Sequence, residues 1–154
     1  MIQRIQSLFL LIVSVLMAFF YFTPYATFMV EPQMLKYSLG ATGLTSVGDS
    51  SENIYSVWAV LILITLVFSI STISIFLYKK RMLQIRLCVV NIVLLLGLQG
   101  ILWFVTHSIS KNISTSPSYS IIFIFPLISA ILTFLALRSI AKDEALVRSL
   151  DRIR

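Results

Sequence analysis

The sequence predicts an all-α membrane protein, built as a four-transmembrane-helix bundle with a small extracytoplasmic loop and a helical cytoplasmic tail. Of the 154 residues, 58% are hydrophobic and 12% are charged, whereas soluble domains carry about a quarter charged residues. The chain contains uncharged runs longer than the roughly 20 residues with which a helix crosses a bilayer. Cations gather between and beyond these runs. The runs cover residues 5–30, 53–78, 87–110 and 112–137.

The first run predicts a retained membrane helix over residues 7–29. A cleaved signal peptide is the alternative, because Arg4 supplies a basic start and Pro24-Tyr25-Ala26 resembles a cleavage site. However, the run is much longer than the roughly 7–15 apolar residues of a signal peptide, and Phe19-Phe20-Tyr21-Phe22 is bulky. We therefore expect an anchor helix.

The segment after this helix, residues 31–53, predicts a small β-hairpin outside the membrane. Residues 33–39 are short and mixed like a strand, and the sequence LGATGL that begins at Leu39 is typical of a turn. Pro126 is expected to kink the last helix, which a membrane bundle tolerates. The other predicted helices cover residues 55–78, 86–106 and 119–137, and the single domain covers residues 1–154.

The cations predict the orientation of the chain in the membrane. If the N-terminus is cytoplasmic, all of the 12 Lys and Arg residues except Lys36 and Lys111 lie on the cytoplasmic side. This asymmetry is what the positive-inside rule requires. It predicts a multi-pass membrane protein with both termini in the cytoplasm.

The tail, residues 138–154, predicts a helical extension of the last span. Leu146, Val147, Leu150 and Ile153 recur at helical spacing and form one apolar stripe. The stripe suits either the membrane surface or a docking partner, and the sequence does not separate these alternatives.

Charged residues that could do chemistry are scarce. From Asn53 to Lys142 the chain has no Asp or Glu, so paired carboxylates for acid–base catalysis are missing from the spans. His107 is the single histidine, and Cys88 is the single cysteine. Neither has neighbours at metal-ligand spacing, and no nucleotide-binding motif occurs. We expect no catalytic residue, no cofactor and no metal.

Uncharged polar residues inside the spans form a candidate intramembrane polar seam. Thr65, Ser69 and Thr72 share one face of the second helix, and Asn91 and Gln99 lie in the third. Such residues usually bond one helix to another. The alternative is a narrow substrate path, which the sequence leaves open.

The cationic turn and the tail form a second candidate site, for anionic lipid headgroups or a partner protein. Each cation near an anionic membrane surface contributes about 1 kcal/mol. Nucleic acid is not expected, because the charges are divided among short segments that flank apolar runs. The candidate contacts are Lys79, Lys80, Arg81, Arg86, Arg148 and Arg152.

The ends and the middle of the chain resemble a family of small four-helix membrane proteins from Bacteroidetes. The resemblance rests on MIQRIQ at the start, YSLG from Tyr37, YKKR from Tyr78, QIR from Gln84, and KDEALVRS from Lys142. It implies the same fold and an inner-membrane location. It implies no catalytic or binding residue, because the family is one of unknown function.

The sequence therefore leaves the biochemical function unknown and supports two hypotheses. The first is a non-catalytic accessory or structural subunit of an inner-membrane complex, with other membrane proteins as partners. The second is a small transporter or channel for a neutral or lipid-like solute. An enzyme is not expected.

Overall fold

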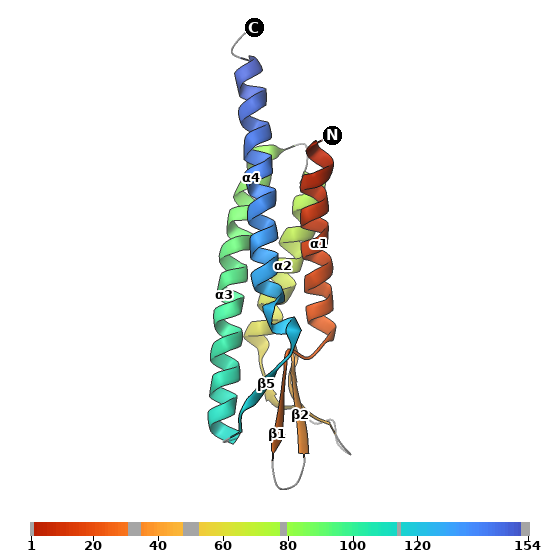
Figure 1. Cartoon of the computed structure of the whole chain (residues 1–154). Helices are drawn as coiled ribbons and strands as arrows, with labels where there is room; N and C mark the ends of the chain where they lie inside the picture. The colour runs from red at the N-terminus through yellow and green to blue at the C-terminus, as the bar shows by residue number, and fades with distance from the viewer. Residues whose placement is uncertain (1, 31–34, 48–52, 78–79, 114, 152–154) are drawn as a thin grey trace.

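The computed structural model of the chain describes residues 2–30, 35–47, 53–77, 80–113 and 115–151. Four long helices stand side by side, and a small sheet covers one end of them (Figure 1). We call this end the sheet end and the opposite one, where both termini lie, the tail end. The helices are α1 (Ile2–Phe22), α2 (Trp58–Phe76), α3 (Arg81–Ile113) and α4 (Phe125–Asp151), with a 3-10 turn, η2, at Ile121–Ile124.

Each helix packs against two others, so that α1 and α3 both contact α2 and α4. The buried residues repeat at alternating steps of three and four, as in α1 at Leu10, Val13, Met17 and Phe20. This spacing produces the nearly parallel packing of left-handed helix bundles. The same repeat in α2 and α3 places serine, glutamine and asparagine side chains in the interior.

The prediction that the first helix extends to Met29 is wrong, because α1 ends at Phe22. Pro24 disfavours helical dihedral angles in the residue before it. The following residues, Ala26–Val30, form strand β1 instead. Residues 26–29 alternate between buried and exposed positions, and the buried Ala26 and Phe28 belong to the core that the strand shares with the bundle.

The predicted hairpin is present, within a larger sheet. Strands β2 (Leu35–Gly40) and β3 (Gly43–Val47) pair antiparallel, with Gly40 opposite Gly43. The intervening Ala41 and Thr42 form a two-residue turn, the most common hairpin connection. The sheet order is β4-β3-β2-β1-β5, with β4 at Asn53–Ser56 and β5 at Pro117–Tyr119.

Strand β5 comes from the connection between α3 and α4, far from the other strands in sequence. It pairs with β1, so the sheet joins the two connections at this end of the bundle. Residues Phe28, Leu39 and Leu44 belong to the same buried cluster as Leu98 and Leu102 of α3. The sheet and the bundle therefore share one core.

The expected kink at Pro126 does not form. Pro126 is the second residue of α4, where the missing N–H has no helical partner to lose. The helix then continues without a break to Asp151, past the ends of the other helices (Figure 1). The third helix is also longer than predicted, since it begins at Arg81 and ends at Ile113.

Within the described part of the chain, three helical segments are long and apolar enough to span a membrane: Trp58–Phe76, Arg81–Ile113 and Ile121–Leu146. Helix α1 contributes a shorter apolar segment, Gln6–Phe22. The outer surface is also apolar, with side chains such as Phe22, Val93 and Phe104 more than 60% exposed. A soluble monomer rarely exposes so much apolar surface, which agrees with a surrounding of lipid.

Candidate functional site

Asp143 holds α4 to two other helices at the tail end. The side-chain amide of Gln6 in α1 donates a 2.7 Å hydrogen bond to Oδ2 of Asp143. Arg81, the first residue of α3, donates to the backbone carbonyl of Asp143 at 3.3 Å. Helix α4 is therefore fixed at the point where it leaves the bundle.

The cationic turn lies beside this contact. Lys80 and Arg86 are exposed, and Arg81 is half-buried. Lys80, Arg81, Met82, Leu83 and Glu144 line a shallow pocket of about 440 Å³. Lys79 and Arg152 lie outside the described residues, and Arg148 is described only as a residue of α4. Lys80 and Arg81 of the turn therefore lie next to Glu144, where the tail begins.

Two buried hydrogen bonds join α2 and α3. Asn91 of α3 donates a hydrogen bond of 3.0 Å to the Ser71 hydroxyl of α2. Gln84, two turns earlier in α3, donates to the carbonyl of Ser74 at 3.1 Å. These four residues are at most 2% exposed. Since the groups bond to each other, the arrangement is that of helix packing.

The residues of the candidate polar seam have different hydrogen-bond partners in the structure. Thr65, Ser69 and Thr72 donate to the carbonyls four residues earlier in their own helix, at 2.8 Å each. Asn91 pairs with Ser71 instead. Gln99 is half-buried, and its Oε1 is a buried atom with no described hydrogen-bond partner.

Sequence reasoning missed Ser71, Ser74 and Gln84. The first two continue the buried series Val60, Ile64 and Val67 at steps of three and four. If the two serines are included in this repeat, it predicts that they lie on the buried face of α2. The spacing of Thr65, Ser69 and Thr72 is equally helical, so periodicity alone cannot tell which face meets α3.

The pair Ser71–Asn91 gives a direct test of the packing role. Asn91→Leu and Ser71→Ala are each expected to lower the free energy of unfolding, with a coupling of roughly 0.6–1.7 kcal/mol in a double-mutant cycle. The measurement is unfolding by SDS in mixed micelles. Thr72→Val is the matched control, because Thr72 bonds only to its own helix among the described contacts. A coupling near zero would show that the bond between Ser71 and Asn91 contributes nothing.

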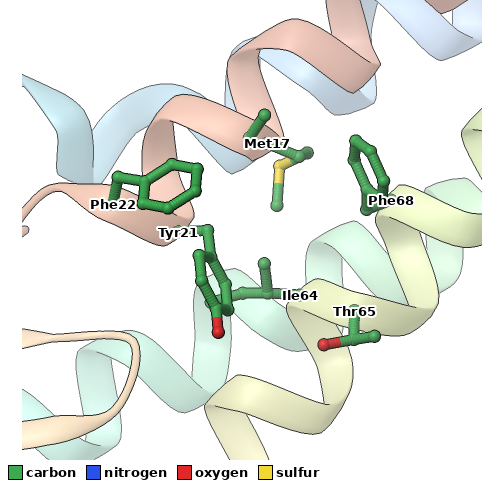
Figure 2. A pocket seen from close by; sticks show the side chains of 7 residues that line it. Met17, Tyr21, Phe22, Ile64, Thr65 and Phe68 are labelled. Atoms are coloured by element: carbon green, nitrogen blue, oxygen red, sulfur yellow. The ribbon is translucent and has the colours of Figure 1, made fainter.

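A pocket opens on the side of the bundle between α1 and α2 (Figure 2). Its volume is about 330 Å³. Figure 2 shows side chains from both helices facing it, with Tyr21 and Thr65 contributing hydroxyl groups. This volume is at the lower end of the range for small-molecule sites. The lining residues are Met17, Ala18, Tyr21, Phe22, Ile64, Thr65 and Phe68.

Tyr25 fills the junction between the bundle and the sheet. Its ring stacks on Phe20 with centroids 5.5 Å apart and also contacts Phe123. Its backbone N–H donates to Leu39, and its carbonyl accepts from Ser120. The side chain is fully buried, and its hydroxyl has no described partner. Burial raises the pKa of this hydroxyl well above its ordinary value.

The described residues contain no group of three or more His, Cys, Asp or Glu side chains that could hold a metal ion. His107 stacks on Trp103 with centroids 5.5 Å apart, and it is exposed at the sheet end of α3. Among the described residues, the histidine is thus part of an aromatic contact at the surface of the bundle.

No curated protein matches the chain. A family described as "Domain of unknown function (DUF4293)" matches residues 2–153, nearly the whole chain. The protein belongs to this DUF4293 family, whose function is unknown.

Proposed function

We propose that the protein spans the bacterial inner membrane with four helices and acts as a non-catalytic accessory subunit of a membrane protein complex. The inner membrane is the location implied by the resemblance to a Bacteroidetes family. The tail end of the bundle would face the cytoplasm, and the sheet would lie outside. Partner proteins would dock on the tail.

The packing of α1 supports the fourth span. Helix α1 contacts both α2 and α4 along the bundle, so it shares their depth. Its 21 residues extend about 32 Å at 1.5 Å per residue, close to the roughly 30 Å of the hydrocarbon layer. The apolar part is shorter, because Arg4 and Gln6 lie near its start.

The positions of the described cations support the orientation. Lys80, Arg81 and Arg86 lie in or before the first turns of α3, at the tail end, and Lys142 lies next to the Asp143 contact. Lys36 is in β2 and Lys111 in the last turn of α3, so both are at the sheet end. The exposed cations of the tail end would meet anionic headgroups.

The observation that carries the docking proposal is the straight continuation of α4. The helix leaves the bundle along its own axis, and Figure 1 shows it projecting beyond the tail ends of α1, α2 and α3. A helix that stands along the membrane normal cannot lay one long face on the membrane surface. This geometry favours a protein partner for the apolar stripe that the sequence predicts at Leu146, Val147, Leu150 and Ile153, of which Ile153 lies outside the described residues.

The test is affinity purification of the full chain, tagged at the N-terminus, from native membranes in a mild detergent. Mass spectrometry of the eluate is expected to reveal a stoichiometric membrane protein. The double variant Leu146→Gln and Leu150→Gln is expected to reduce its recovery at least tenfold, which corresponds to about 1.4 kcal/mol.

The matched control is Ala145→Gln, because Ala145 is an exposed residue of the same helix and helical spacing places it away from the stripe. It should leave recovery of the partner unchanged. Purification of the wild-type protein without any stoichiometric partner would refute the accessory role. A partner retained by the double variant would refute docking through the stripe.

The pocket between α1 and α2 favours the second function, a carrier for a neutral or lipid-like solute. The test uses vesicles that contain the protein and a fluorescent phosphatidylcholine, with dithionite to bleach the outer leaflet. Faster bleaching of inner-leaflet lipid than in protein-free vesicles would support a lipid carrier. Asn91→Leu with Gln99→Leu should slow it only if these residues line the path.

A further inference from the structure

We propose that the groove between α1 and α2 binds one acyl chain of a membrane glycerolipid, with the ester carbonyl at the Tyr21 hydroxyl. The groove is the 330 Å³ pocket lined by Met17, Tyr21, Ile64 and Phe68, among others. The inference goes beyond the accessory role and rests on the proposed placement in the membrane.

The groove opens sideways from the bundle. Its floor is formed by Met17 and Ile64, which are at most 1% exposed. Its rim is formed by Phe22 and Phe68, which are 82% and 41% exposed. A side opening in an apolar span faces lipid chains, so the occupant reaches it from the bilayer and not from water.

The shape and chemistry of the groove suit a chain with a single polar end. Met, Ile and Phe side chains form most of its wall, which matches methylene groups. Tyr21 lies in the last turn of α1, next to Phe22, where the apolar segment of this helix ends. That is the level at which aromatic side chains usually meet the membrane interface.

The hydroxyl groups of Tyr21 and Thr65 differ in whether they still have a proton to donate to a ligand. Thr65 donates its proton to the carbonyl of Leu61 at 2.8 Å, so only acceptor sites remain on its oxygen. No described residue accepts a hydrogen bond from the Tyr21 hydroxyl. An unpaired donor at the border of hydrocarbon is unfavourable. An ester carbonyl offers the acceptor that this hydroxyl needs, whereas a plain alkane does not.

The experiment uses the full chain in phosphatidylcholine vesicles that contain a phosphatidylcholine with a diazirine on one acyl chain. After irradiation, adducts are mapped by mass spectrometry. Adducts are expected to concentrate on residues 17–22 and 64–68. Ala18→Trp, which fills the groove, is expected to lower these adducts about tenfold, equivalent to 1.4 kcal/mol. Ala18→Leu is a smaller change that preserves the packing, and it should give a partial decrease.

Leu11→Trp is the matched control, since Leu11 is an exposed residue of α1 outside the groove. It should leave the groove adducts unchanged. Tyr21→Phe keeps the ring and should reduce the adducts severalfold while leaving the fold intact.

Two outcomes would contradict parts of the proposal. Adducts that are spread evenly over the outer faces of all four helices, and that do not change in Ala18→Trp, would refute binding in the groove without contradicting the placement in the membrane. An absence of adducts on α1, with labelling of the other helices, would instead refute the fourth span.

Discussion

Replacing Tyr25 with alanine is expected to lower the free energy of unfolding by about 3–5 kcal/mol, the usual cost of truncating a large buried aromatic residue. Tyr25 is fully buried, stacks on Phe20 and contacts Phe123. The alanine keeps the backbone bonds to Leu39 and Ser120, so the loss isolates the packing of the ring. The measurement is thermal or SDS-induced unfolding in detergent micelles.

Tyr25→Phe is the matched control, and it should be neutral or slightly stabilising. It removes a buried hydroxyl that has no described partner and keeps the ring. A large loss of stability in this variant would show that the hydroxyl does have a partner, such as an internal water.

The wild-type protein and the Tyr25→Phe variant should also differ in how their free energy of unfolding changes in alkaline solution. Burial raises the pKa of Tyr25 above its ordinary value of 10.0, so the folded state keeps the proton when the unfolded state releases it. The contribution of Tyr25 is therefore fully present below pH 10.0 and is lost as the pH rises above it. The slope reaches at most about 1.4 kcal/mol per pH unit. Tyr25→Phe should lack this part of the decline.

Replacing Gly43 with alanine is expected to lower the free energy of unfolding by roughly 1–3 kcal/mol. Gly43 begins β3 with φ of 139°, a conformation that residues with a Cβ atom rarely adopt. It lies opposite Gly40 at the closed end of the hairpin. Strain here would loosen the pairing of β2 with β3, which urea-induced unfolding and amide exchange would detect.

Gly40→Ala is the control for this change. A Cβ atom at Gly40 would have no heavy atom within 4 Å. This variant should therefore stay within about 0.5 kcal/mol of the wild type, as most surface changes do. Equal losses in both variants would mean that the hairpin resists any added side chain and that the dihedral angle of Gly43 is unimportant.

Much of the helical architecture can be predicted from the sequence, because a helix that crosses hydrocarbon requires a long run of uncharged residues. Uncharged runs of sufficient length predict helices, and α2 and α3 lie within or around their predicted ranges. The boundaries were less accurate. The same residue type had two effects: α1 ends before Pro24, whereas Pro126 lies in the first turn of α4 and causes no kink.

The candidate sites show what composition and periodicity cannot supply. Thr65 and Ser71 have similar side chains and lie in the same helix, yet Thr65 lines the groove and Ser71 bonds to Asn91. Which of them faces α3 depends on the rotation of α2 about its axis. That rotation is set by packing against both α1 and α3, so it is a property of the whole bundle.

The sequence by itself determined the mostly helical class, the apolar character of the long helices, the hairpin and the scarcity of ionisable groups in the apolar runs. These features follow from local composition, because each depends on residues that are near one another in the chain. Only the tertiary structure decided that β5 joins β1, that Gln6 and Arg81 both hold Asp143, and that α1 and α2 enclose a groove. Each of these pairs residues far apart in the sequence, and their meeting depends on how the helices pack together.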